Sequence, residues 1–260
     1  MRPHIAAVYA FARIADDFAD EGDVPPAARL ARLDDWQQRL CAAADRKPID
    51  DGTEGAAVFV ALAETMRVCA LDAAPFLDLL SAFKQDVTVR RYETWADVLD
   101  YSRRSANPVG RIVLKVAGSV DASTGRASDA VCTALQLTNF WQDLAGDWGR
   151  GRLYVPMAVV RAAGAEPGDL DRRQITPEWR NALADVAART RRLFADGRAV
   201  ADGVRGRLRW ELRATWLGGV RVLDRLERGG FDVFAHRPAL GWRDVTPIVW
   251  RAAAWRRASS

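Results

Sequence analysis

The sequence contains few of the residues that most often build catalytic and metal centres. Its 260 residues include three cysteines, which lie far apart, and two histidines. The cysteines offer neither a disulfide framework nor a Cys-x-x-Cys zinc site, and two histidines leave almost no material for a Ser-His-Asp triad or a His-rich metal site. Any chemistry must therefore be carried by carboxylates, hydroxyls, guanidiniums or a hard metal ion.

Long apolar runs are also missing. No segment approaches the ~20 consecutive apolar residues of a membrane-spanning helix, and the first residues lack the apolar stretch of a signal peptide. We therefore expect a cytoplasmic protein. With 49% hydrophobic and 28% charged residues, the composition is that of an ordinary globular protein and excludes a disordered or collagen-like chain.

Lysine is the third scarce residue, with 3 Lys against 35 Arg. Residues 191–260 carry 15 Arg and 7 acids, a net charge of +8, whereas residues 1–190 carry 23 basic and 27 acidic residues, a net charge of −4. Arginine favours bidentate contacts with phosphate or carboxylate groups. A compositional bias of the source gives the same excess, so the arginines alone do not indicate a function.

Apolar residues recur at helical intervals along nearly the whole chain, and no segment shows the alternation of a β-strand bounded by hairpin turns. The sequence therefore predicts an all-α bundle and a single domain over residues 1–260. The expected helices cover residues 5–20, 30–40, 54–70, 75–89, 95–118, 127–147, 177–202 and 206–228, with a short one after Pro156. The expected helix starts are Asp72 with Pro75 and Thr176 with Pro177, and the expected loops are residues 146–151 and 229–247.

The first group of candidate functional residues is acidic and lies at the end of the first expected helix. Asp16 and Asp20 are four positions apart and therefore share a face, with Arg13 and Tyr9 on the preceding turns and Asp17 beside them. Like charges at this spacing repel by a few tenths of a kcal/mol. Such a concentration of carboxylates indicates either a solvated acidic helix end or a cation site.

A second polar row runs along the expected helix at residues 127–147. Asn139, Asp143 and Asp147 recur every four positions, and Gln136 precedes them by three, on an otherwise apolar helix. Carboxylates buried in an apolar interior need a charge partner. Oxygen ligands without nearby His or Cys suit Mg²⁺, which keeps several waters and is shared with substrate phosphates. We therefore expect the two acidic groups to face each other across a cavity and to hold a diphosphate through Mg²⁺.

Two further segments are compatible with such a site. Arg150, Arg152 and Tyr154 directly follow the second row and supply donors for phosphate oxygens, although a basic surface loop has the same composition. Pro108, in the segment Tyr101–Gly110, is expected to bend its helix, and the small residues around it open space for a long apolar ligand. Packing alone also explains such a kink.

Together these motifs resemble those of the squalene/phytoene synthases, the head-to-head class of trans-isoprenyl diphosphate synthases. The similarity rests on the paired acidic motifs, the run from Tyr9 to Asp20, the segment Tyr101–Gly110 and the Arg-Gly-Arg-x-Tyr-x-Pro signature at residues 150–156, and it extends over most of the chain. Within the family, residues 105–110 and 140–143 are similar to the hydroxysqualene synthase branch of bacterial hopanoid biosynthesis. The resemblance implies an isoprenoid-synthase helical bundle around a central apolar cavity.

The resemblance also implies a mechanism. Presqualene diphosphate ionises to a cyclopropylcarbinyl cation, which rearranges and is captured by water to give hydroxysqualene and diphosphate. Two or three Mg²⁺ ions stabilise the departing diphosphate, and no nicotinamide cofactor is expected because water ends the reaction. Other enzymes of the pathway are expected as partners on either side of this step.

The functional roles of the family transfer onto the residues that match its motifs. The resemblance places Mg²⁺ and diphosphate on Asp16, Asp17, Asp20, Asn139, Asp143 and Asp147. It gives substrate binding to Tyr9, Arg13, Asp17, Asn139, Arg150, Arg152 and Tyr154, and direct catalytic roles to Asp16, Asp20, Tyr101, Asp143 and Asp147. Aromatic faces that stabilise the cation are expected at Tyr9, Phe11, Tyr101, Phe140 and Trp141.

Other functions stay open on the sequence alone. A presqualene diphosphate, squalene or phytoene synthase, which condenses two prenyl diphosphates head to head, shares the same motifs. The Asp-Asp-x-x-Asp pattern at residues 16–20 also occurs in chain-elongating prenyltransferases and class I terpene cyclases, but the second motif of neither class is present. A non-enzymatic helical binding protein would release no diphosphate in a Mg²⁺-dependent assay, which separates it from every enzyme.

The C-terminal segment, residues 246–260, is basic and rich in tryptophan. Trp250, Arg251, Trp255 and Arg256 follow one another at near-helical spacing, a pattern suited to a helix at an anionic membrane surface rather than to nucleic acid. We therefore expect peripheral contact with the inner face of the membrane, with a packed C-terminal helix as the alternative. At the other end, the chain begins close to the first acidic motif, and the resemblance implies that the first helix of the family is missing.

Overall fold

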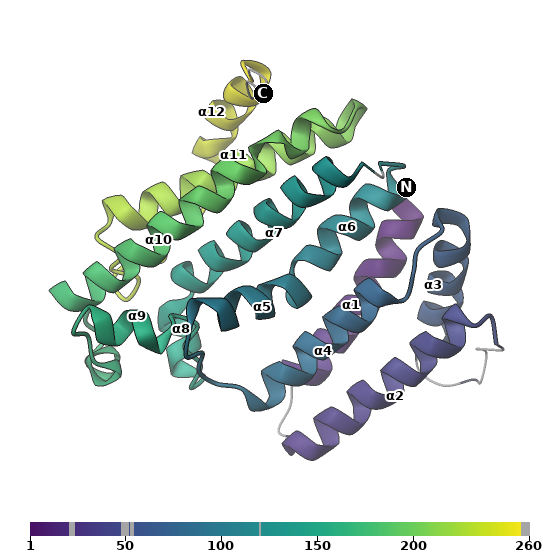
Figure 1. The fold of residues 1–260 in the computed structure, drawn as a ribbon, viewed down its shortest axis with the longest axis horizontal. Helices are drawn as coiled ribbons and strands as arrows, with labels where there is room; N and C mark the ends of the chain where they lie inside the picture. Colours follow the sequence, from purple (N-terminus) through teal and green to yellow (C-terminus); the bar gives the residue numbers. More distant parts are fainter. Residues whose placement is uncertain (21–23, 48–51, 53–54, 120, 256–260) are drawn as a thin grey trace. The chain divides into compact units, whose positions relative to one another are not determined.

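Helices make up almost all the regular structure of the chain (Figure 1), as the periodicity predicts. The computed structural model describes residues 1–20, 24–47, 52, 55–119 and 121–255. Within these ranges, the β-structure consists of a single parallel bridge between Arg91 and Leu153. No helix in the described part of the chain is both long enough and apolar enough to cross a membrane. The all-α fold class is thereby confirmed.

The helices follow one another with short connections. Their bounds are α1 (Arg2–Asp20), α2 (Pro26–Ala44), α3 (Ala56–Cys69), α4 (Ala74–Thr88), α5 (Trp95–Ser105), α6 (Asn107–Val116), α7 (Ala122–Gln142), α8 (Leu144–Gly149), α9 (Met157–Ala162), α10 (Pro177–Gly197), α11 (Gly206–Arg228) and α12 (Trp242–Ala253). Two 3₁₀ helices, η1 (Pro167–Arg172) and η2 (Arg198–Asp202), complete the list.

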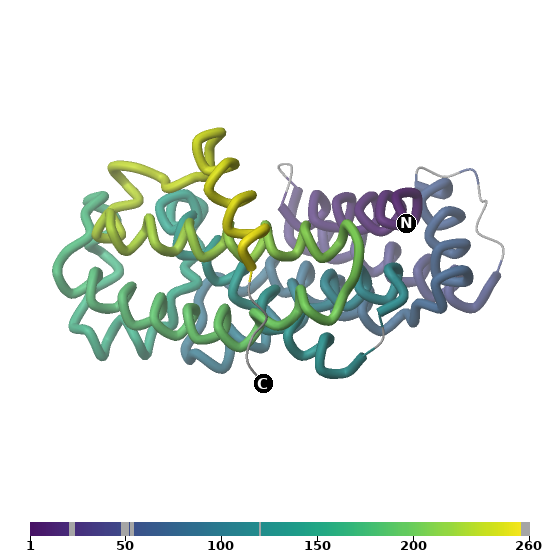
Figure 2. The backbone as a smooth tube through the Cα atoms, turned by 90° about the horizontal axis from the view of Figure 1, so that it is seen from above, coloured from purple at the N-terminus to yellow at the C-terminus, as the bar shows by residue number. Residues whose placement is uncertain are grey.

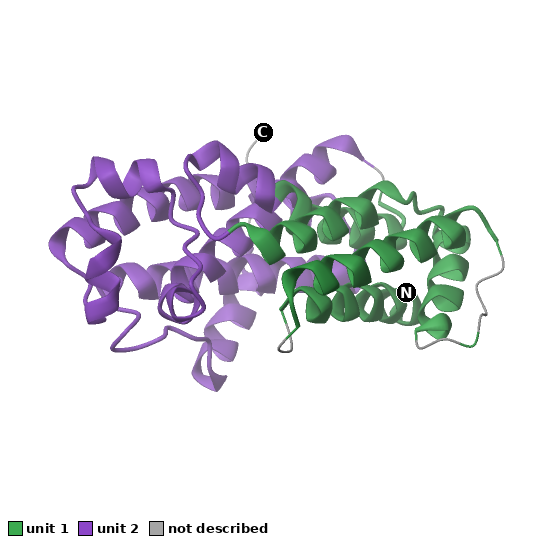
Figure 3. Ribbon diagram, turned by 90° about the horizontal axis from the view of Figure 1, so that it is seen from below, with its two compact units in different colours: residues 1–89, 103–120 green, residues 90–102, 121–260 purple. Residues whose placement is uncertain are grey.

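The chain divides into two compact units, shown in different colours in Figure 3. Unit 1 comprises residues 1–89 and 103–120, and unit 2 comprises residues 90–102 and 121–260, so the boundary passes through α5. The single domain over residues 1–260 therefore stays a prediction.

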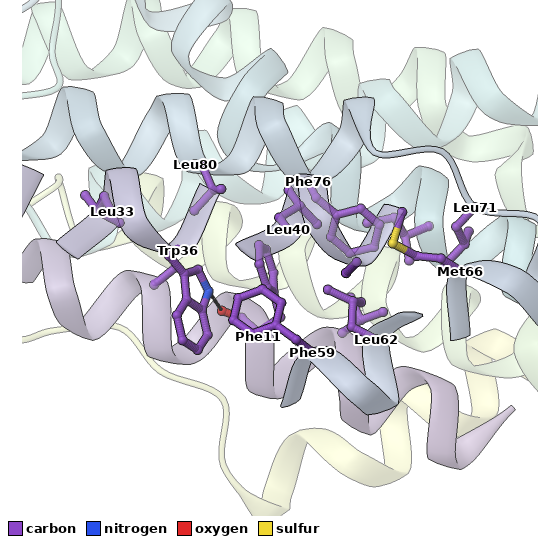
Figure 4. Close-up of a cluster of buried hydrophobic side chains, with 14 of the residues drawn as sticks. Phe11, Leu33, Trp36, Leu40, Phe59, Leu62, Met66, Leu71, Phe76 and Leu80 are labelled. Atoms are coloured by element: carbon purple, nitrogen blue, oxygen red, sulfur yellow. Dashed lines mark hydrogen bonds between the residues drawn. The ribbon is translucent and has the colours of Figure 1, made fainter. Parts of the chain in front are cut away.

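The core of unit 1 is built around α1, which packs against α2, α3 and α4. Phe11 of α1 is fully buried among Trp36, Phe59 and Phe76, and its ring lies edge-on to Phe76 at 5.5 Å (Figure 4). The indole Nε1 of Trp36 donates a hydrogen bond to the backbone oxygen of Phe11 at 3.3 Å. Burying an aromatic ring of this size contributes about 1.5–3 kcal/mol. These contacts fix which face of α1 turns inward.

In unit 2, α7 packs against both α10 and α11 (Figure 1). The helices α7 and α10 approach closely at Gly197, where an added Cβ would lie 2.5 Å from a methyl group of Val131. Thr176 caps α10 by accepting a hydrogen bond from the backbone N–H of Trp179 at 3.3 Å, as the Thr-Pro pair predicts. The packing of α7 on α10 and α11 therefore sets the position of the polar row on α7.

Several helices begin or end at residues other than those expected from the sequence. The helix expected at 127–147 begins at Ala122 and gives way after Gln142 to α8, so most of the loop expected at residues 146–151 is helical. The helix expected at 95–118 is divided at Ala106, because Pro108 is the second residue of α6 and a proline at that position starts a helix rather than bending one.

Two further boundaries differ near the C-terminus. The last residues of the helix expected at 177–202 form the 3₁₀ helix η2. The loop expected at residues 229–247 ends early, because α12 begins at Trp242. The backbone N–H of Gly241 donates to the carboxylate of Asp244 at 2.7 Å, and this contact stabilises the start of α12.

Candidate functional site

The first acidic group lies at the C-terminal end of α1 in unit 1. Arg13 contacts two of its carboxylates, Asp16 at 3.4 Å and Asp17 at 2.7 Å. The carboxylates of Asp16 and Asp17 are partly exposed, and Asp20 is exposed. The C-terminal end of a helix carries partial negative charge. Three carboxylates there add to this negative charge, so bound cations would stabilise the end of α1.

The aromatic residues expected to accompany this group have different positions. Tyr9 is two thirds exposed and lies one turn before Arg13. Its side chain can therefore contact a ligand that binds at the acidic end of α1. Phe11 points the other way, into the core of unit 1 (Figure 4). The structure therefore gives Phe11 a packing role in place of the cation-stabilising role expected from the resemblance.

The second polar row spans the junction of α7 and α8 in unit 2. The backbone N–H of Asp143 donates to the carbonyl of Asn139 at 2.8 Å, and that of Asp147 donates to the carbonyl of Asp143 at 2.9 Å. The four-residue spacing is therefore kept although the helix assignment changes at Asp143. Burial increases along the row: Asn139 is exposed, the Asp143 side chain is 35% exposed, and that of Asp147 is 10% exposed. The row is thus buried only at its last member.

Burial determines the electrostatics of Asp147. Loss of solvent raises the pKa of its carboxyl, and the like charge of Asp143 raises the pKa further. Arg150 opposes this shift with a hydrogen bond to the Asp147 carboxylate at 2.8 Å, and the charge of Arg152 acts in the same direction. The net shift is upward, so the carboxylate of Asp147 would gain from a further positive charge.

Asp143 has a partner that local sequence patterns do not reveal. The Nε of Arg237 donates to its carboxylate at 2.5 Å, which raises the pKa of the Arg237 guanidinium. The neighbouring Gln142 donates to the carbonyl of Pro238. These two contacts hold the segment between α11 and α12 against the end of α7. The two residues of the ion pair are 94 positions apart, which explains why spacing rules do not find it.

The basic segment after α8 is mostly internal. Arg150 is exposed, but Arg152 and Tyr154 are buried. A second strand-like segment lies alongside: the backbone N–H of Leu153 donates to the carbonyl of Arg90 at 3.0 Å, and Arg91 donates to the carbonyl of Gly151 at 2.6 Å. The segment is therefore not a basic surface loop, which is the alternative that its composition allows.

Four aromatic rings form a buried cluster in unit 2: Tyr92, Tyr101, Phe140 and Tyr154. Phe140 and Tyr154 stack with ring centroids 3.8 Å apart and an interplanar angle of 2°, and Tyr101 lies 6.0 Å from Phe140. Three of its members are among the residues expected from the sequence. Tyr92 is not among the expected residues. It lies in the segment that forms the bridge with residues 151–157.

Trp141 packs against α10, whereas the resemblance implies that its ring stabilises the substrate cation. Its Nε1 donates to the hydroxyl of Thr190 on α10 at 2.9 Å, and its ring is 1% exposed. Trp95 stacks on it with centroids 6.5 Å apart. Trp141 therefore contributes mainly to the contact between α7 and α10.

The candidate ligands of a metal ion are all oxygen atoms. Within the described ranges, no three or more His, Cys, Asp or Glu side chains gather closely enough to hold a metal ion by themselves. Oxygen donors fit Mg²⁺, which binds to proteins through one or two carboxylates and completes its shell with water and substrate phosphates. The acidic group of α1 and the row on α7–α8 belong to different units, so their facing across a cavity stays a prediction.

Comparisons with known proteins agree with these observations. A family model described as squalene/phytoene synthase matches residues 1–244. The hydroxysqualene synthase of Rhodopseudomonas palustris is 38% identical over 205 residues, which are 78% of this chain and 67% of that protein. The hydroxysqualene synthase of Zymomonas mobilis is 39% identical over 196 residues, 74% of this chain and 63% of that protein. The chain thus matches about two thirds of the length of these relatives.

Solved structures show the same similarity. A squalene synthase from Alicyclobacillus acidocaldarius has a TM-score of 0.81 and 39% identity, and the match covers 88% of this chain and 84% of that one. A dehydrosqualene synthase in complex with a ligand has a TM-score of 0.84 at 21% identity, covering 96% of this chain and 85% of that one. The second comparison supports the fold alone.

Proposed function

The chain belongs to the squalene/phytoene synthase family, which is a family of isoprenoid synthases, and on this basis we propose that it is a Mg²⁺-dependent hydroxysqualene synthase. Its reaction would convert presqualene diphosphate and water to hydroxysqualene and diphosphate. The observation that carries the proposal is the arrangement of unit 2. There the polar row on α7–α8 leads directly into the buried arginine Arg152 and the aromatic cluster of Tyr92, Tyr101, Phe140 and Tyr154. Such a sequence of polar and apolar surfaces suits a substrate with a diphosphate head and an oily chain.

The charged residues act on the diphosphate. Arg150 and Arg152 donate to its oxygens and neutralise the charge that grows as it departs. Arg13 does the same from the end of α1. Magnesium, held by Asp16, Asp17, Asp20, Asn139, Asp143 and Asp147, would supply Lewis-acid stabilisation of the leaving group. The carboxylates are therefore the residues that make the site selective for a diphosphate with its metal ions.

The aromatic cluster acts on the other half of the substrate. When the carbon–oxygen bond breaks, its electron pair leaves with the diphosphate and a carbocation remains. Phe140 and Tyr154 stack on each other, so only the ring faces turned away from that stack can stabilise a cation through the negative ring quadrupole and keep bulk water away from it. We propose that the hydroxyl of Tyr101 orients the diphosphate. The cyclopropylcarbinyl cation rearranges, and a single water then adds its oxygen to the rearranged cation. The departed diphosphate accepts the proton that this water loses, which gives hydroxysqualene and diphosphate.

One assay tests the proposal. Purified protein and Mg²⁺ are incubated separately with presqualene diphosphate and with farnesyl diphosphate, and the products are identified by mass spectrometry. We expect hydroxysqualene and diphosphate from presqualene diphosphate. Consumption of farnesyl diphosphate alone would overturn the assignment in favour of head-to-head condensation, and no diphosphate release from either substrate would exclude an enzyme of this family. The reaction also requires enzymes that supply presqualene diphosphate and consume hydroxysqualene, which are its expected pathway partners.

A further inference from the structure

The outer face of α12 is apolar and unusually exposed. The side chains Trp242, Val245, Val249 and Trp250 are 79%, 57%, 59% and 71% exposed. Their spacing of three, four and one residues places them on one side of the helix. Single exposed apolar residues are ordinary on protein surfaces, but a contiguous group marks an interaction site. We call these four residues the outer stripe of α12.

The opposite face of α12 is anchored to α11, which lies beside it (Figure 2). The carboxylate of Asp244 is buried and accepts hydrogen bonds from Arg221 and Arg225 of α11, the second at 2.6 Å. Near the other end of α12, Arg213 of α11 donates to the carbonyl of the buried Ala252 at 3.1 Å. Because both ends of one face are attached, the outer stripe is held away from α11.

Trp255 belongs to the anchored side. Its ring lies edge-on to Trp216 at 5.3 Å, and the guanidinium of Arg198 lies 4.3 Å from its centroid. Of the two alternatives expected for this part of the chain, a helix at the membrane and a packed helix, the contacts of Trp255 agree with the second. The exposed stripe begins at Trp242, before the segment 246–260 that is expected at the membrane, and residues 256–260 lie outside the described residues.

The exposed charged side chains of α12 are all positive. Asp244 is the only acidic residue in the sequence from 238 to 260, and two arginines of α11 neutralise it. Arg243 and Arg251 are exposed on α12, and the guanidinium of Arg243 lies 5.3 Å from the centroid of Trp242. A second copy of this surface would bring arginines against arginines. Anionic lipid headgroups, in contrast, complement the arginines, and tryptophan side chains favour the boundary between headgroups and acyl chains.

We propose that the outer stripe of α12 docks on the surface of an anionic lipid bilayer, with α12 lying in the plane of the interface. Trp242 and Trp250 are eight residues apart, which corresponds to about 12 Å along the helix axis. Both indoles therefore enter the headgroup layer together, while the two valines bury their methyl groups between them. Arg243 and Arg251 contact the lipid phosphates.

The first test removes the apolar contacts with a matched control. The variant Val245→Ser/Val249→Ser is compared with Val60→Ser/Val68→Ser, which changes two valines of α3 that are each 51% exposed. Binding is measured by flotation with phosphatidylcholine vesicles that contain phosphatidylglycerol. We expect the α12 variant to partition about tenfold more weakly than the unchanged protein, since two valines lose most of their apolar burial. The α3 variant should bind as the unchanged protein does.

The second test concerns charge. Arg243→Gln/Arg251→Gln should weaken binding to the phosphatidylglycerol vesicles by about tenfold at low salt. Added salt should weaken binding of the unchanged protein in the same direction. Equal binding of this variant and of the unchanged protein to the anionic vesicles would overturn the electrostatic part of the proposal.

Two outcomes would overturn the proposal as a whole. One is unchanged vesicle binding of Val245→Ser/Val249→Ser, provided that circular dichroism shows a folded protein. The other is a dimeric unchanged protein whose Val245→Ser/Val249→Ser variant is monomeric but still binds vesicles, which would make the stripe a contact between copies of the chain. Turnover of detergent-solubilised presqualene diphosphate should be equal in all variants, so the membrane proposal and the proposed reaction fail independently.

Discussion

Arg237 donates from its Nε to the carboxylate of Asp143, one of the residues that we propose to hold Mg²⁺. This guanidinium comes from the loop before α12 and pairs with the carboxylate. A metal ion at Asp143 has to compete with that guanidinium. The ion pair is partly exposed, so its contribution is modest, about 0.2–1 kcal/mol.

Replacement of Arg237 should therefore strengthen metal binding. We expect Arg237→Gln to lower the dissociation constant of Mg²⁺ by about two- to fivefold. Titration calorimetry with Mg²⁺ in the presence of inorganic diphosphate measures this constant. Arg228→Gln, at an exposed arginine on α11 that pairs with Asp224 at 3.7 Å, serves as the control and should leave it unchanged. Weaker Mg²⁺ binding by Arg237→Gln would show that Arg237 assists the metal site instead of competing with it.

Asp143 itself should be essential. Asp143→Ala removes a proposed metal ligand, and the loss of several kcal/mol of transition-state stabilisation corresponds to a decrease of about 100-fold or more in kcat/KM. Release of diphosphate from presqualene diphosphate is the readout. Asp185→Ala, which changes an exposed aspartate paired with Arg189 on α10, should remain active. A fully active Asp143→Ala enzyme would remove the polar row on α7–α8 from the site.

Asp147 should show opposite effects on stability and activity. Because the pKa of its carboxyl is raised in the folded protein, its contribution to stability is fully present below the unfolded pKa and is lost as pH rises through the folded pKa. At neutral pH the charge of Asp147 thus costs stability. We expect Asp147→Asn to raise Tm by about 1–4 °C at pH 7 while turnover falls, as measured by calorimetry and by diphosphate release. A lower Tm would indicate that the contact with Arg150 outweighs the cost of burial.

Two glycines of unit 2 should respond in opposite ways to alanine. An added Cβ at Gly197 would lie 2.5 Å from Val131 and 2.8 Å from the backbone oxygen of Ala127, so α7 and α10 would have to separate. We expect Gly197→Ala to lower the free energy of unfolding by about 1–3 kcal/mol. At Gly125, inside α7, nothing lies within 4 Å of an added Cβ. There the substitution should raise the free energy of unfolding by about 0.5–1 kcal/mol. Urea unfolding curves measure both changes, and equal effects would contradict the close approach of the two helices.

The anchor of α12 should depend on pH. The backbone N–H of Gly241 and the guanidiniums of Arg221 and Arg225 hold the pKa of the Asp244 carboxyl below its usual range. The stabilisation is therefore present above the ordinary pKa and is lost as pH falls through the lower folded-state value. We expect Asp244→Asn to have a lower Tm than the unchanged protein at pH 6, and the two values to converge as the pH falls below the lowered pKa of Asp244 in the folded protein. A difference that persists undiminished in acid would assign the effect to packing alone.

Local patterns predicted much of the fold. Helical periodicity located most helices, and the cap at Thr176 formed where a Thr-Pro pair predicts a helix start. The exact ends were less predictable, because they depend on tertiary contacts. The polar row kept its spacing through Asp143, but the sequence does not show that the regular helix stops there.

Sequence patterns connect the residues of the proposed site only where these residues are close in the sequence. Asp143, Asp147, Arg150 and Arg152 follow one another along the chain, and their proximity is a direct result of helical spacing. Tyr92 and Arg237 join them from distant segments, and no short-range pattern connects these residues to the row. The opposite error occurred at Phe11, since an aromatic residue next to an acidic motif can belong to the core as readily as to a substrate cavity.

Backbone hydrogen bonds connect Asn139 to Asp143, Asp143 to Asp147, and Asp147 to Arg152 in one continuous series. The aromatic cluster is held separately, by the stacking of Phe140 on Tyr154 and the rings around them. The residues that we propose to bind the diphosphate and the aromatic residues that we propose to contact the hydrocarbon chain are therefore held by different interactions. For protein engineering, this separation makes the aromatic positions a suitable target for variant libraries that change the accepted chain length, since the diphosphate-handling residues would keep their scaffold.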